Sequence, residues 1–466
     1  MSSGFPDLVR EAGVVGCGGA GFPAHIKASS RADTVIANGA ECEPLLHKDL
    51  ELLVREAPAV VRGIRLLMES TGAKRGIIGV KKKNAERLAP LSAAAQGAGV
   101  EVLFLGDFYP TGDEYILVYE ATRRLIPPGG IPLNVGVVVS NVETLRNMSR
   151  AAEGIPVTSK YVTVAGAVPR AVTLEVPVGT PFADLIRAAG GAAADDVAAF
   201  SGGVMMGSLT TDFAQPVTKT CAGLILLPMT HTLVTRKSLT PGAMHRIGKS
   251  ACDQCSYCTE LCPRYLLGYE VQPHKVMRSL SFTATGEDIW NRYADLCCSC
   301  GLCTLYACPE DLYPKEACDR SKADSRARGL TWHGKTEVSV HPIYDGRHVP
   351  LGRLMKKLGI DRYDVPAGFA EMSVMPRRVT LPLAQYAGQN VPPEAGQNVP
   401  LPASKSGTSA RPLVRTGERV SRGQKIAEYS GGRTGAHIHA SIDGVVSLTE
   451  KGIVIEQPQE RSRQHA

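Results

Sequence analysis

Two rows of regularly spaced cysteines constrain this chain more than any other feature. The first row runs Cys252-x2-Cys255-x2-Cys258-x3-Cys262-Pro263, and the second runs Cys297-x2-Cys300-x2-Cys303-x4-Cys308-Pro309. In the bacterial ferredoxin version of this spacing, three thiolates of a row hold one [4Fe–4S] cluster and the fourth reaches the neighbouring cluster. We therefore predict two sets of ligands, Cys252, Cys255, Cys258 and Cys308 for one cluster and Cys297, Cys300, Cys303 and Cys262 for the other.

Zinc is the main alternative to iron–sulfur, because paired Cys-x2-Cys motifs also build zinc sites. Zinc gives no reason for a third evenly spaced cysteine or for the Cys-Pro endings, so we favour iron–sulfur. The second row has one extra residue before Cys308, which makes its crossover less regular. Cys298 is either an alternative ligand or, as we favour, a buried thiol without a role.

Composition narrows the class of protein. Thirteen cysteines without a basic and apolar leader sequence favour a reducing compartment over a disulfide framework. We expect no transmembrane segment, since no apolar run reaches 18 residues. The 466 residues suffice for about three domains. A net charge of +7 and 5% aromatic residues do not favour nucleic acid as a partner, and we interpret Lys81 to Lys83 as the solvated start of a helix.

The N-terminal half alternates short apolar strands with helices. Strands are predicted at 34–37, 76–80, 100–105 and 135–140, and helices at 7–12, at 84–96 and, as one long amphipathic helix, from Leu50 to Leu67. Asn141 is the predicted N-cap of the helix after the last strand. Alternating strands and helices favour a mainly parallel sheet with binding loops at the carboxyl ends of its strands.

A glycine-rich loop lies at residues 16–21, with Lys27 shortly after it. Its letters fit GxGxxG, but no full strand precedes the glycines, so the match to a dinucleotide fingerprint is weak. Closely spaced glycines let the backbone approach a phosphate, and a lysine adds positive charge. A tight structural turn is the alternative, although it explains only one or two of the glycines.

Four segments, GCGGAGFPxxxK, NGAECEP, YPTGDE and NVETL, together resemble the flavin-binding subunit of respiratory complex I and its relatives. Those relatives include the C subunit of the Rnf complex and the cobalamin reductases of propanediol-utilising microcompartments. The resemblance implies that FMN is held by Gly16, Gly18, Gly19, Lys27, Asn38, Gly112, Asn141 and Thr144. It implies that Phe22, Glu41, Glu43 and Glu114 face the nicotinamide nucleotide. Taken singly, the glutamates could be ordinary loop carboxylates and Lys27 a solvated helix residue.

The resemblance implies a multidomain α/β chain with five segments. They are a Rossmann-like FMN- and NADH-binding domain (1–155), a β-grasp (SLBB) module (156–230), a helical domain with two [4Fe–4S] clusters (231–335), a connector (336–376) and a biotinyl/lipoyl-like barrel-sandwich module (377–460). Within them the sequence predicts strands at 162–166 and 173–176, a helix with Thr180 as cap and Pro181 first, helices at 265–269 and 287–294, and a helix at 351–358. We assign no catalytic residue.

The C-terminal module lacks the lysine that carries a prosthetic group in lipoyl-like barrels. His437 and His439 alternate along a strand and so share a face. A metal or cobalt ligand role is the sharper interpretation, but we favour solvated histidines because no third ligand is in view. The sequence Ala-Gly-Gln-Asn-Val-Pro occurs at 387–392 and again at 395–400, and we interpret it as a duplicated flexible loop.

Domain order favours one branch of the family. The barrel module comes last here, as in the cobalamin reductases, whereas Rnf C subunits carry it before the flavin domain. The resemblance implies an oxidoreductase that passes electrons from NADH through FMN and two clusters to cob(III)- or cob(II)alamin, in support of a B12-dependent diol dehydratase. It also implies a cytoplasmic location inside a bacterial microcompartment, with a shell protein or an adenosyltransferase as partner. The alternatives are a peripheral Rnf-type subunit on a membrane complex, a microcompartment NADH oxidoreductase with another protein acceptor, and a scaffold without flavin.

Overall fold

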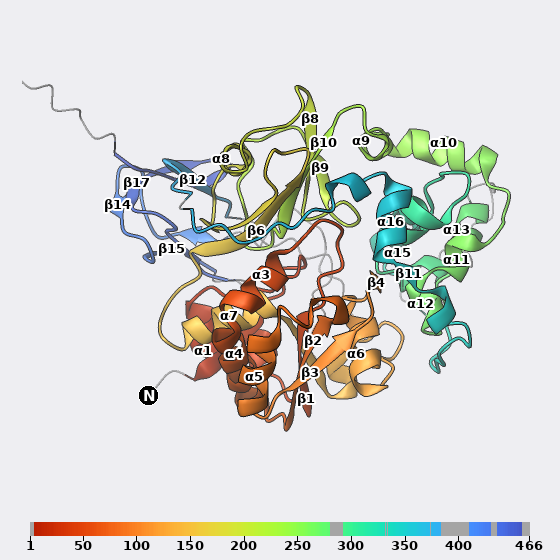
Figure 1. Ribbon diagram of the computed structural model, residues 1–466, viewed down its shortest axis with the longest axis horizontal. Coiled ribbons are helices and arrows are strands. Elements are labelled where there is room, and N and C mark those ends of the chain that lie inside the picture. The colour runs from red at the N-terminus through yellow and green to blue at the C-terminus, as the bar shows by residue number, and fades with distance from the viewer. Residues whose placement is uncertain are drawn as a thin grey trace, which may run out of the picture.

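The structure is a computed structural model that describes residues 4–279, 292–330, 332, 334–372, 374–383, 410–429 and 436–458. Figure 1 shows four parts: an N-terminal α/β domain at the bottom, a β-rich module above it, the helices of the cysteine-rich segment on the right and a C-terminal β module on the left. The multidomain α/β organisation therefore agrees with the prediction.

The N-terminal domain is built on a parallel sheet in the order β3-β2-β1-β5. Its strands are β1 (Thr34–Gly39), β2 (Arg75–Lys81), β3 (Glu101–Leu105) and β5 (Val137–Asn141). Its helices are α1 (Phe5–Glu11), α2 (Ala24–Ala28), α3 (Lys48–Arg55), α4 (Ala57–Thr71), α5 (Ala89–Gly97), α6 (Glu114–Thr122) and α7 (Val142–Ala151), with 3-10 turns η1 (Lys82–Asn84) and η2 (Pro132–Val135) and a short strand β4 (Phe108–Tyr109). The predicted parallel sheet is confirmed.

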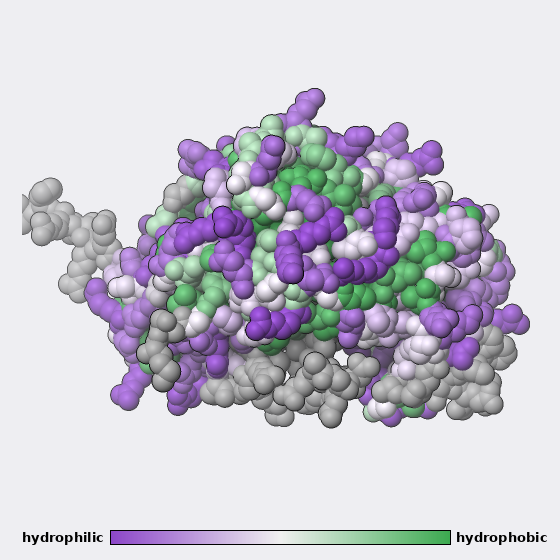
Figure 2. Space-filling model, turned by 90° about the horizontal axis from the view of Figure 1, so that it is seen from below, coloured by the Kyte–Doolittle hydropathy of each residue, from purple (hydrophilic) through white to green (hydrophobic). Residues whose placement is uncertain are grey.

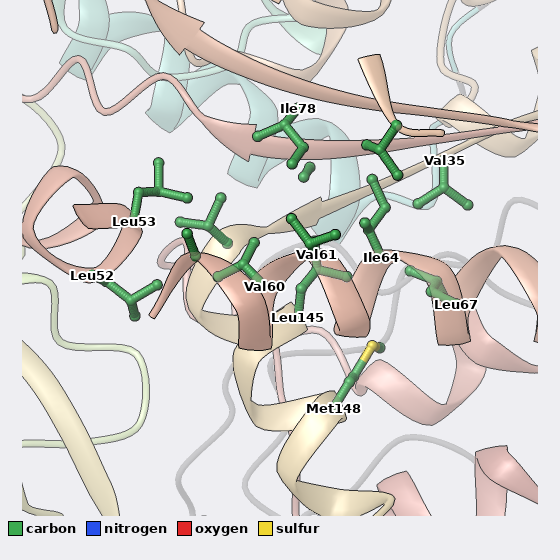
Figure 3. Packing of buried hydrophobic residues seen from close by; sticks show 14 of the residues in the cluster. Val35, Leu52, Leu53, Val60, Val61, Ile64, Leu67, Ile78, Leu145 and Met148 are labelled. Atoms are coloured by element: carbon green, nitrogen blue, oxygen red, sulfur yellow. The ribbon is translucent and has the colours of Figure 1, made fainter. Parts of the chain in front are cut away.

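Each face of this sheet has its own hydrophobic core. On one face, Val35 and Ile78 pack against α4 and α7, as the labelled side chains in Figure 3 show. Helices α4 and α7 approach so closely that a Cβ on Gly63 would lie 2.0 Å from the backbone oxygen of Leu145. On the other face, Ile36 and Ile77 pack with residues of α6. Strands β1, β2 and β5 are therefore largely buried on both faces, as parallel strands usually are, whereas the edge strand β3 is partly exposed.

Two predicted helices are wrong in their bounds. The single helix from Leu50 to Leu67 is divided at Glu56 into α3 and α4. Pro58 explains the break, since a proline lacks the N–H that a helix interior requires and fits only in the first turn, where it lies in α4. The helix predicted at 84–96 begins instead at Ala89, again with a proline, Pro90, in its first turn.

The strand order places the candidate binding loops side by side. The chain runs from β1 to β2 on one side of β1 and later adds β5 on its other side. In open α/β sheets such a reversal opens a crevice at the carboxyl ends of the two strands, where ligands bind. Here Asn38 at the end of β1 is in register with Asn141 at the end of β5. The loops predicted to bind the ligand therefore meet at the switch point.

The second module is a mixed five-stranded sheet in the order β7-β6-β10-β8-β9, covered by one helix. Its elements are β6 (Ser159–Gly166), β7 (Val172–Pro177), α8 (Phe182–Ala188), β8 (Val197–Ser201), β9 (Ser208–Thr210) and β10 (Gly223–Pro228). The predicted cap of α8 is wrong: Pro181 is the N-cap, and the Thr180 hydroxyl donates to the backbone oxygen of Pro177 instead.

The cysteine-rich segment is helical, as predicted. It contains α9 (Thr232–Lys237), α10 (Pro241–Ala251), α11 (Tyr257–Glu260), α12 (Pro263–Leu266), α13 (Pro273–Ser279), α14 (Arg292–Asp295), the π-helical turn η3 (Cys303–Ala307) and α15 (Pro314–Ala327). The helix expected at 265–269 lies earlier, as α12. Of the one expected at 287–294, residues 287–291 lie outside the described residues.

The connector ties the cysteine-rich segment to the N-terminal domain. It contains η4 (Asp345–Arg347), β11 (Val349–Pro350), α16 (Leu351–Leu358) and η5 (Asp361–Tyr363). Strand β11 pairs with β4 of the N-terminal domain, with Val349 opposite Tyr109. The predicted helix at 351–358 is confirmed with the same bounds.

The C-terminal module consists of two small sheets around one core. Its strands are β12 (Arg378–Leu381), β13 (Arg411–Pro412), β14 (Arg419–Val420), β15 (Lys425–Glu428), β16 (Ile438–His439), β17 (Gly444–Thr449) and β18 (Gly452–Glu456). The prediction of solvated histidines is wrong, since His437 is 5% and His439 6% exposed. His437 Nε2 lies 3.2 Å from Glu11 Oε1, so it contacts the N-terminal domain. The repeated hexapeptide at 387–392 and 395–400 lies outside the described residues.

The surface is mixed in character. On the face seen from below, hydrophobic residues gather in patches separated by hydrophilic ones (Figure 2). Within the described part of the chain, every helix is too short or too polar to cross a bilayer.

Candidate functional site

The glycine-rich loop is held against the start of α7. The backbone N–H of Cys17 donates to Thr144 Oγ1 at 2.9 Å. A Cβ on Gly18 would lie 3.6 Å from Asn141 Cβ, while Gly19, with φ +105°, has no atom within 4 Å of its would-be Cβ. The loop is therefore fixed on one side and open on the other, which leaves backbone groups accessible to a ligand.

Three loops meet at the carboxyl ends of β1 and β5. Asn38 Nδ2 donates to the backbone oxygen of Gly112 at 2.9 Å. Asn141 Oδ1 accepts from the N–H of Glu143 at 3.0 Å, which confirms the predicted N-cap. Asn141 Nδ2 donates to Asp49 Oδ2 at 2.9 Å. The structure thus brings together residues that the family resemblance assigns to the flavin.

Lys27 and Glu114 are charged residues of the predicted site, and each affects the pKa of the other. Lys27 Nζ donates to the backbone oxygen of Val139 at 2.6 Å and lies 5.4 Å from the centroid of the Phe22 ring. Burial lowers the pKa of Lys27, and the charge of Glu114 opposes that effect. Glu114 is exposed, yet desolvation by the surrounding protein raises its pKa, and the charge of Lys27 opposes that effect. Lys27 is thus a desolvated cation rather than a solvated helix residue.

The two glutamates of the loop after β1 both accept hydrogen bonds from backbone N–H groups. Glu41 Oε2 accepts from the N–H of Asp49 at 3.1 Å. Burial, reinforced by the charge of Asp49, raises the pKa of Glu41 to about 8. Glu43 accepts from the N–H groups of Met205 and Met206 at 3.0 and 2.8 Å, so a loop of the second module covers it. Burial raises the pKa of Glu43 to about 7. Neither is an ordinary loop carboxylate.

The raised pKa of Glu41 predicts a pH dependence of stability. Between the ordinary value of 4.5 and about 8, native Glu41 holds a proton that the unfolded chain has released. Stability therefore falls as pH rises through this range. In Glu41→Gln this contribution is absent, so we expect its unfolding temperature to fall less than that of the wild type between about pH 4.5 and 8. Thermal unfolding across this range measures it, with Glu86→Gln, an exposed carboxylate, as control. An unchanged slope in Glu41→Gln contradicts the prediction.

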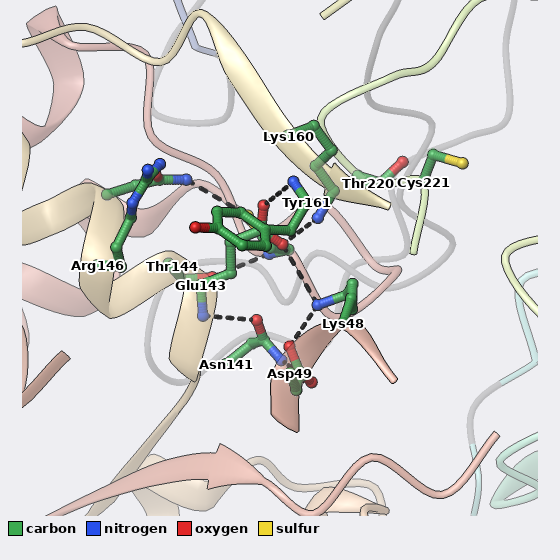
Figure 4. Close-up of polar contacts among 12 residues, drawn as sticks. Lys48, Asp49, Asn141, Glu143, Thr144, Arg146, Lys160, Tyr161, Thr220 and Cys221 are labelled. Atoms are coloured by element: carbon green, nitrogen blue, oxygen red, sulfur yellow. Dashed lines mark hydrogen bonds and ion pairs between the residues drawn. The ribbon is translucent and has the colours of Figure 1, made fainter. Parts of the chain in front are cut away.

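A buried network of charges next to the loops was not predicted from the sequence (Figure 4). Glu143, which is fully buried, pairs with Lys160 of β6 and with Lys48 at 3.3 Å. It also accepts from the N–H of Tyr161 at 2.9 Å. Lys48 pairs in addition with Asp49, the partner of Asn141. The network links the second module to the N-cap of α7. The only signal in the sequence was that Glu143 lies within the NVETL segment.

The interpretation of Lys81 as a solvated residue is wrong. Lys81 is 4% exposed and its Nζ lies 2.9 Å from Asp107 Oδ1, so it is a buried ion-pair partner. Lys83 pairs with the second oxygen of the same carboxylate at 2.9 Å and is half exposed.

The structure places Cys308 with cysteines of the first row and Cys262 with a cysteine of the second row. Cys252, Cys255, Cys258 and Cys308 line one pocket, although Cys308 belongs to the other row. In the second group, Cys262 and Cys297 share a hydrophobic cluster. Burial raises the pKa of Cys262, and the Cys297 and Cys298 thiols add to the effect. Among the described residues, no three metal-ligating side chains converge on the position of a single ion. A [4Fe–4S] cluster, with one thiolate on each iron, does not require that. The ligand assignment stays a prediction.

The second cysteine group touches the N-terminal domain directly. Tyr109 Oη donates to the backbone oxygen of Cys300 at 2.6 Å. Arg264, two residues after Cys262, pairs with Asp113 Oδ2 at 2.9 Å. Both Tyr109 and Asp113 belong to the YPTGDE segment. The first group reaches the surface, where Cys255 is exposed. The second group is therefore the one with contacts to the YPTGDE segment (109–114), which we call the candidate flavin loop.

The residues present fit a flavin at the switch point. Within the described part of the chain, the Thr111 and Ser140 hydroxyl oxygens are buried without a hydrogen-bond partner. Both lie next to residues that the resemblance assigns to FMN, namely Gly112 and Asn141. Buried hydroxyls normally have partners, so two unpaired hydroxyls next to Gly112 and Asn141 suit a polar ligand.

Comparison with known proteins agrees with this picture. Four family models match: the Nuo51 FMN-binding domain at residues 9–150, the SLBB domain at 161–208, a 4Fe-4S dicluster domain at 251–313 and the RnfC barrel sandwich hybrid domain at 389–462. Cobalamin reductase PduS of Citrobacter freundii is 38% identical over 451 residues, which cover 96% of this chain and 95% of the relative. The chain belongs to the PduS family. It is therefore a flavin–iron–sulfur oxidoreductase, and the predicted FMN and [4Fe–4S] cofactors are confirmed at the level of their domains.

Two further relatives place the family in context. Cobalamin reductase PduS of Salmonella typhimurium is also 38% identical, with 96% of this chain and 95% of the relative covered. The C subunit of the proton-translocating ferredoxin:NAD(+) oxidoreductase complex of Clostridium ljungdahlii is 34% identical over 265 residues, covering 56% of this chain and 55% of the relative. The likeness to PduS thus extends over nearly the whole chain, whereas the likeness to this relative extends over little more than half.

Proposed function

We propose that this chain carries electrons from NADH, by way of FMN and two [4Fe–4S] clusters, to cobalamin, and so supports a B12-dependent diol dehydratase. The observation that carries the proposal is the contact of the candidate flavin loop with the second cysteine group through Tyr109 and Arg264. The acceptor is inferred from the relatives, which are cobalamin reductases by name. We further propose a location inside a bacterial microcompartment, with a shell protein or an adenosyltransferase as partner.

The proposed roles of the site residues follow the family resemblance. FMN is held by Gly16, Gly18, Gly19, Lys27, Asn38, Gly112, Asn141 and Thr144, while Phe22, Glu41, Glu43 and Glu114 face the nicotinamide nucleotide. When bound, FMN converts the two electrons of a hydride donor into single electrons that the clusters conduct. Lys27 supplies a desolvated positive charge, and Thr144 fixes the glycine loop through the Cys17 N–H.

The geometry supports an order of the two clusters. The group of Cys262, Cys297, Cys300 and Cys303 adjoins the flavin loop, so we infer that its cluster receives electrons first. The group of Cys252, Cys255, Cys258 and Cys308 reaches the surface at Cys255, so we infer that its cluster passes electrons to the acceptor.

An anaerobic absorbance time course with NADH and hydroxocobalamin tests the proposal. We expect the flavin to bleach and the cobalt to be reduced in the same experiment. Bleaching without cobalt reduction would assign the electrons to another protein acceptor, the case of a different microcompartment or Rnf-type oxidoreductase. If neither changes, NADH is not the donor and the proposed role of Phe22, Glu41, Glu43 and Glu114 is wrong.

A further inference from the structure

Arg264 bridges the flavin loop and the second cysteine group. It belongs to α12, two residues after Cys262, and is 6% exposed. Its Nη2 donates to Asp113 Oδ2 at 2.9 Å, and its guanidinium carbon lies 3.4 Å from the centroid of the Tyr115 ring. Asp113 is the N-cap of α6, with Oδ1 bound to backbone N–H groups. The guanidinium is therefore fixed in position from the side of the N-terminal domain.

Two of its nitrogens have no partner. Within the described part of the chain, Arg264 Nε and Nη1 are buried and have no hydrogen-bond acceptor within reach. A guanidinium carries five N–H donors, and a buried donor that is left without an acceptor destabilises the folded state. That destabilisation predicts an acceptor on that side of the residue. Cys262, two residues before Arg264, belongs to the second group of cysteines, and the cluster predicted for that group is anionic and can accept hydrogen bonds through its sulfurs.

Arg264 carries a positive charge. An arginine side chain is not deprotonated in proteins, so the guanidinium keeps its positive charge beside Asp113. A fixed positive charge beside a cluster favours the reduced state of the cluster, which is the more negative one, and hydrogen bonds to cluster sulfurs act in the same direction.

We propose that Arg264 is a positioning residue that donates its unpaired N–H groups to the cluster of Cys262, Cys297, Cys300 and Cys303 and raises the reduction potential of that cluster above the value it would otherwise have. The inference rests on the proposed function, since it takes this group of cysteines to hold a cluster. It explains why a buried arginine follows a Cys-Pro pair directly. It also gives the cluster nearest the flavin loop a means of accepting electrons readily.

The test is a potentiometric titration of the anaerobic holoprotein followed by electron paramagnetic resonance. In Arg264→Gln we expect one of the two cluster signals to shift to lower potential by a roughly tenfold change in its one-electron equilibrium, which is about 59 mV, while the other stays unchanged. Arg264→Lys keeps the charge but loses the planar fork, so its shift should be smaller.

Asp113→Asn separates an electrostatic role from a merely structural one. Asparagine is as good an N-cap as aspartate, so α6 stays capped, but the negative charge beside the guanidinium is lost. If Arg264 acts on the cluster, Asp113→Asn raises the potential that Arg264→Gln lowers. Shifts of both variants in the same direction, or no shift in Arg264→Gln at full iron content, overturn the inference. If Arg264→Gln loses iron, the cluster potentials of Arg264→Lys and Asp113→Asn test the inference in its place.

The outcomes also distinguish this inference from the proposed function. A wild-type protein with both cluster signals but no reaction with NADH or cobalamin fails the proposed function, while the potentials of the Arg264 variants still decide the inference. A wild-type protein without cluster signals overturns the inference itself.

Discussion

Substituting Cys308 by alanine is expected to remove the same cluster as substituting Cys255, although the two residues belong to different rows of the sequence. Both line one pocket with Cys252 and Cys258. Each single variant should keep about half of the iron, about four atoms per chain instead of about eight, and both should lack the same signal in electron paramagnetic resonance. Cys262→Ala should lack the other signal, because Cys262 lies with Cys297.

Double variants distinguish crossed ligand sets from an arrangement in which each row holds its own cluster. Cys255→Ala/Cys308→Ala should lose no more iron than either single variant, whereas Cys255→Ala/Cys262→Ala should lose nearly all of it. If each row instead held its own cluster, the outcomes of the two double variants would be exchanged. Cys221→Ala is the matched control, because Cys221 is a buried cysteine of the second module and outside both rows. It should keep both signals and all of the iron.

Features that depend on short stretches of sequence could be predicted. Helix α16 was predicted with its observed bounds because Leu351, Leu354, Met355 and Leu358 lie on one buried face, and Gly359 ends the helix in the left-handed conformation. The Asn141 cap was also predicted, since a cap needs only the end of a strand and a short polar side chain. The cysteine spacing belongs to the same class of signal.

Features that depend on distant partners could not be predicted. Lys48, Lys81 and Lys160 are nearly fully buried, although lysine is almost never buried unless it is paired. Their partners are carboxylates elsewhere in the chain, and for Lys48 one of them, Glu143, is 95 residues away. Likewise, His437 is buried because it meets Glu11 of another domain. A hydropathy pattern contains no information about distant partners, so it predicts that such charged side chains are exposed.

The network around Glu143 should carry a large part of the stability of the N-terminal domain. Glu143 is fully buried and forms ion pairs with both Lys160 and Lys48, whose side chains are 1% exposed. Removal of one partner of a buried ion pair costs about 3–5 kcal/mol, because it leaves a charge without compensation. We therefore expect Glu143→Gln to lower the free energy of unfolding by about that amount, as measured by chemical denaturation. Glu153→Gln breaks only an exposed pair with Arg62 and should change it by less than about 1 kcal/mol.

A second substitution separates the charge effect from packing. In Glu143→Gln/Lys160→Met, no cation of the network is left unpaired, because Lys48 keeps Asp49 as its partner. Replacement of a whole buried pair by groups of similar volume is often nearly neutral. The double variant should therefore recover most of the stability lost in Glu143→Gln, although it carries one more change. If the double variant is instead less stable than the single one, the loss comes from the shape of the site and the charges of the network are not what stabilises the contact between the two modules.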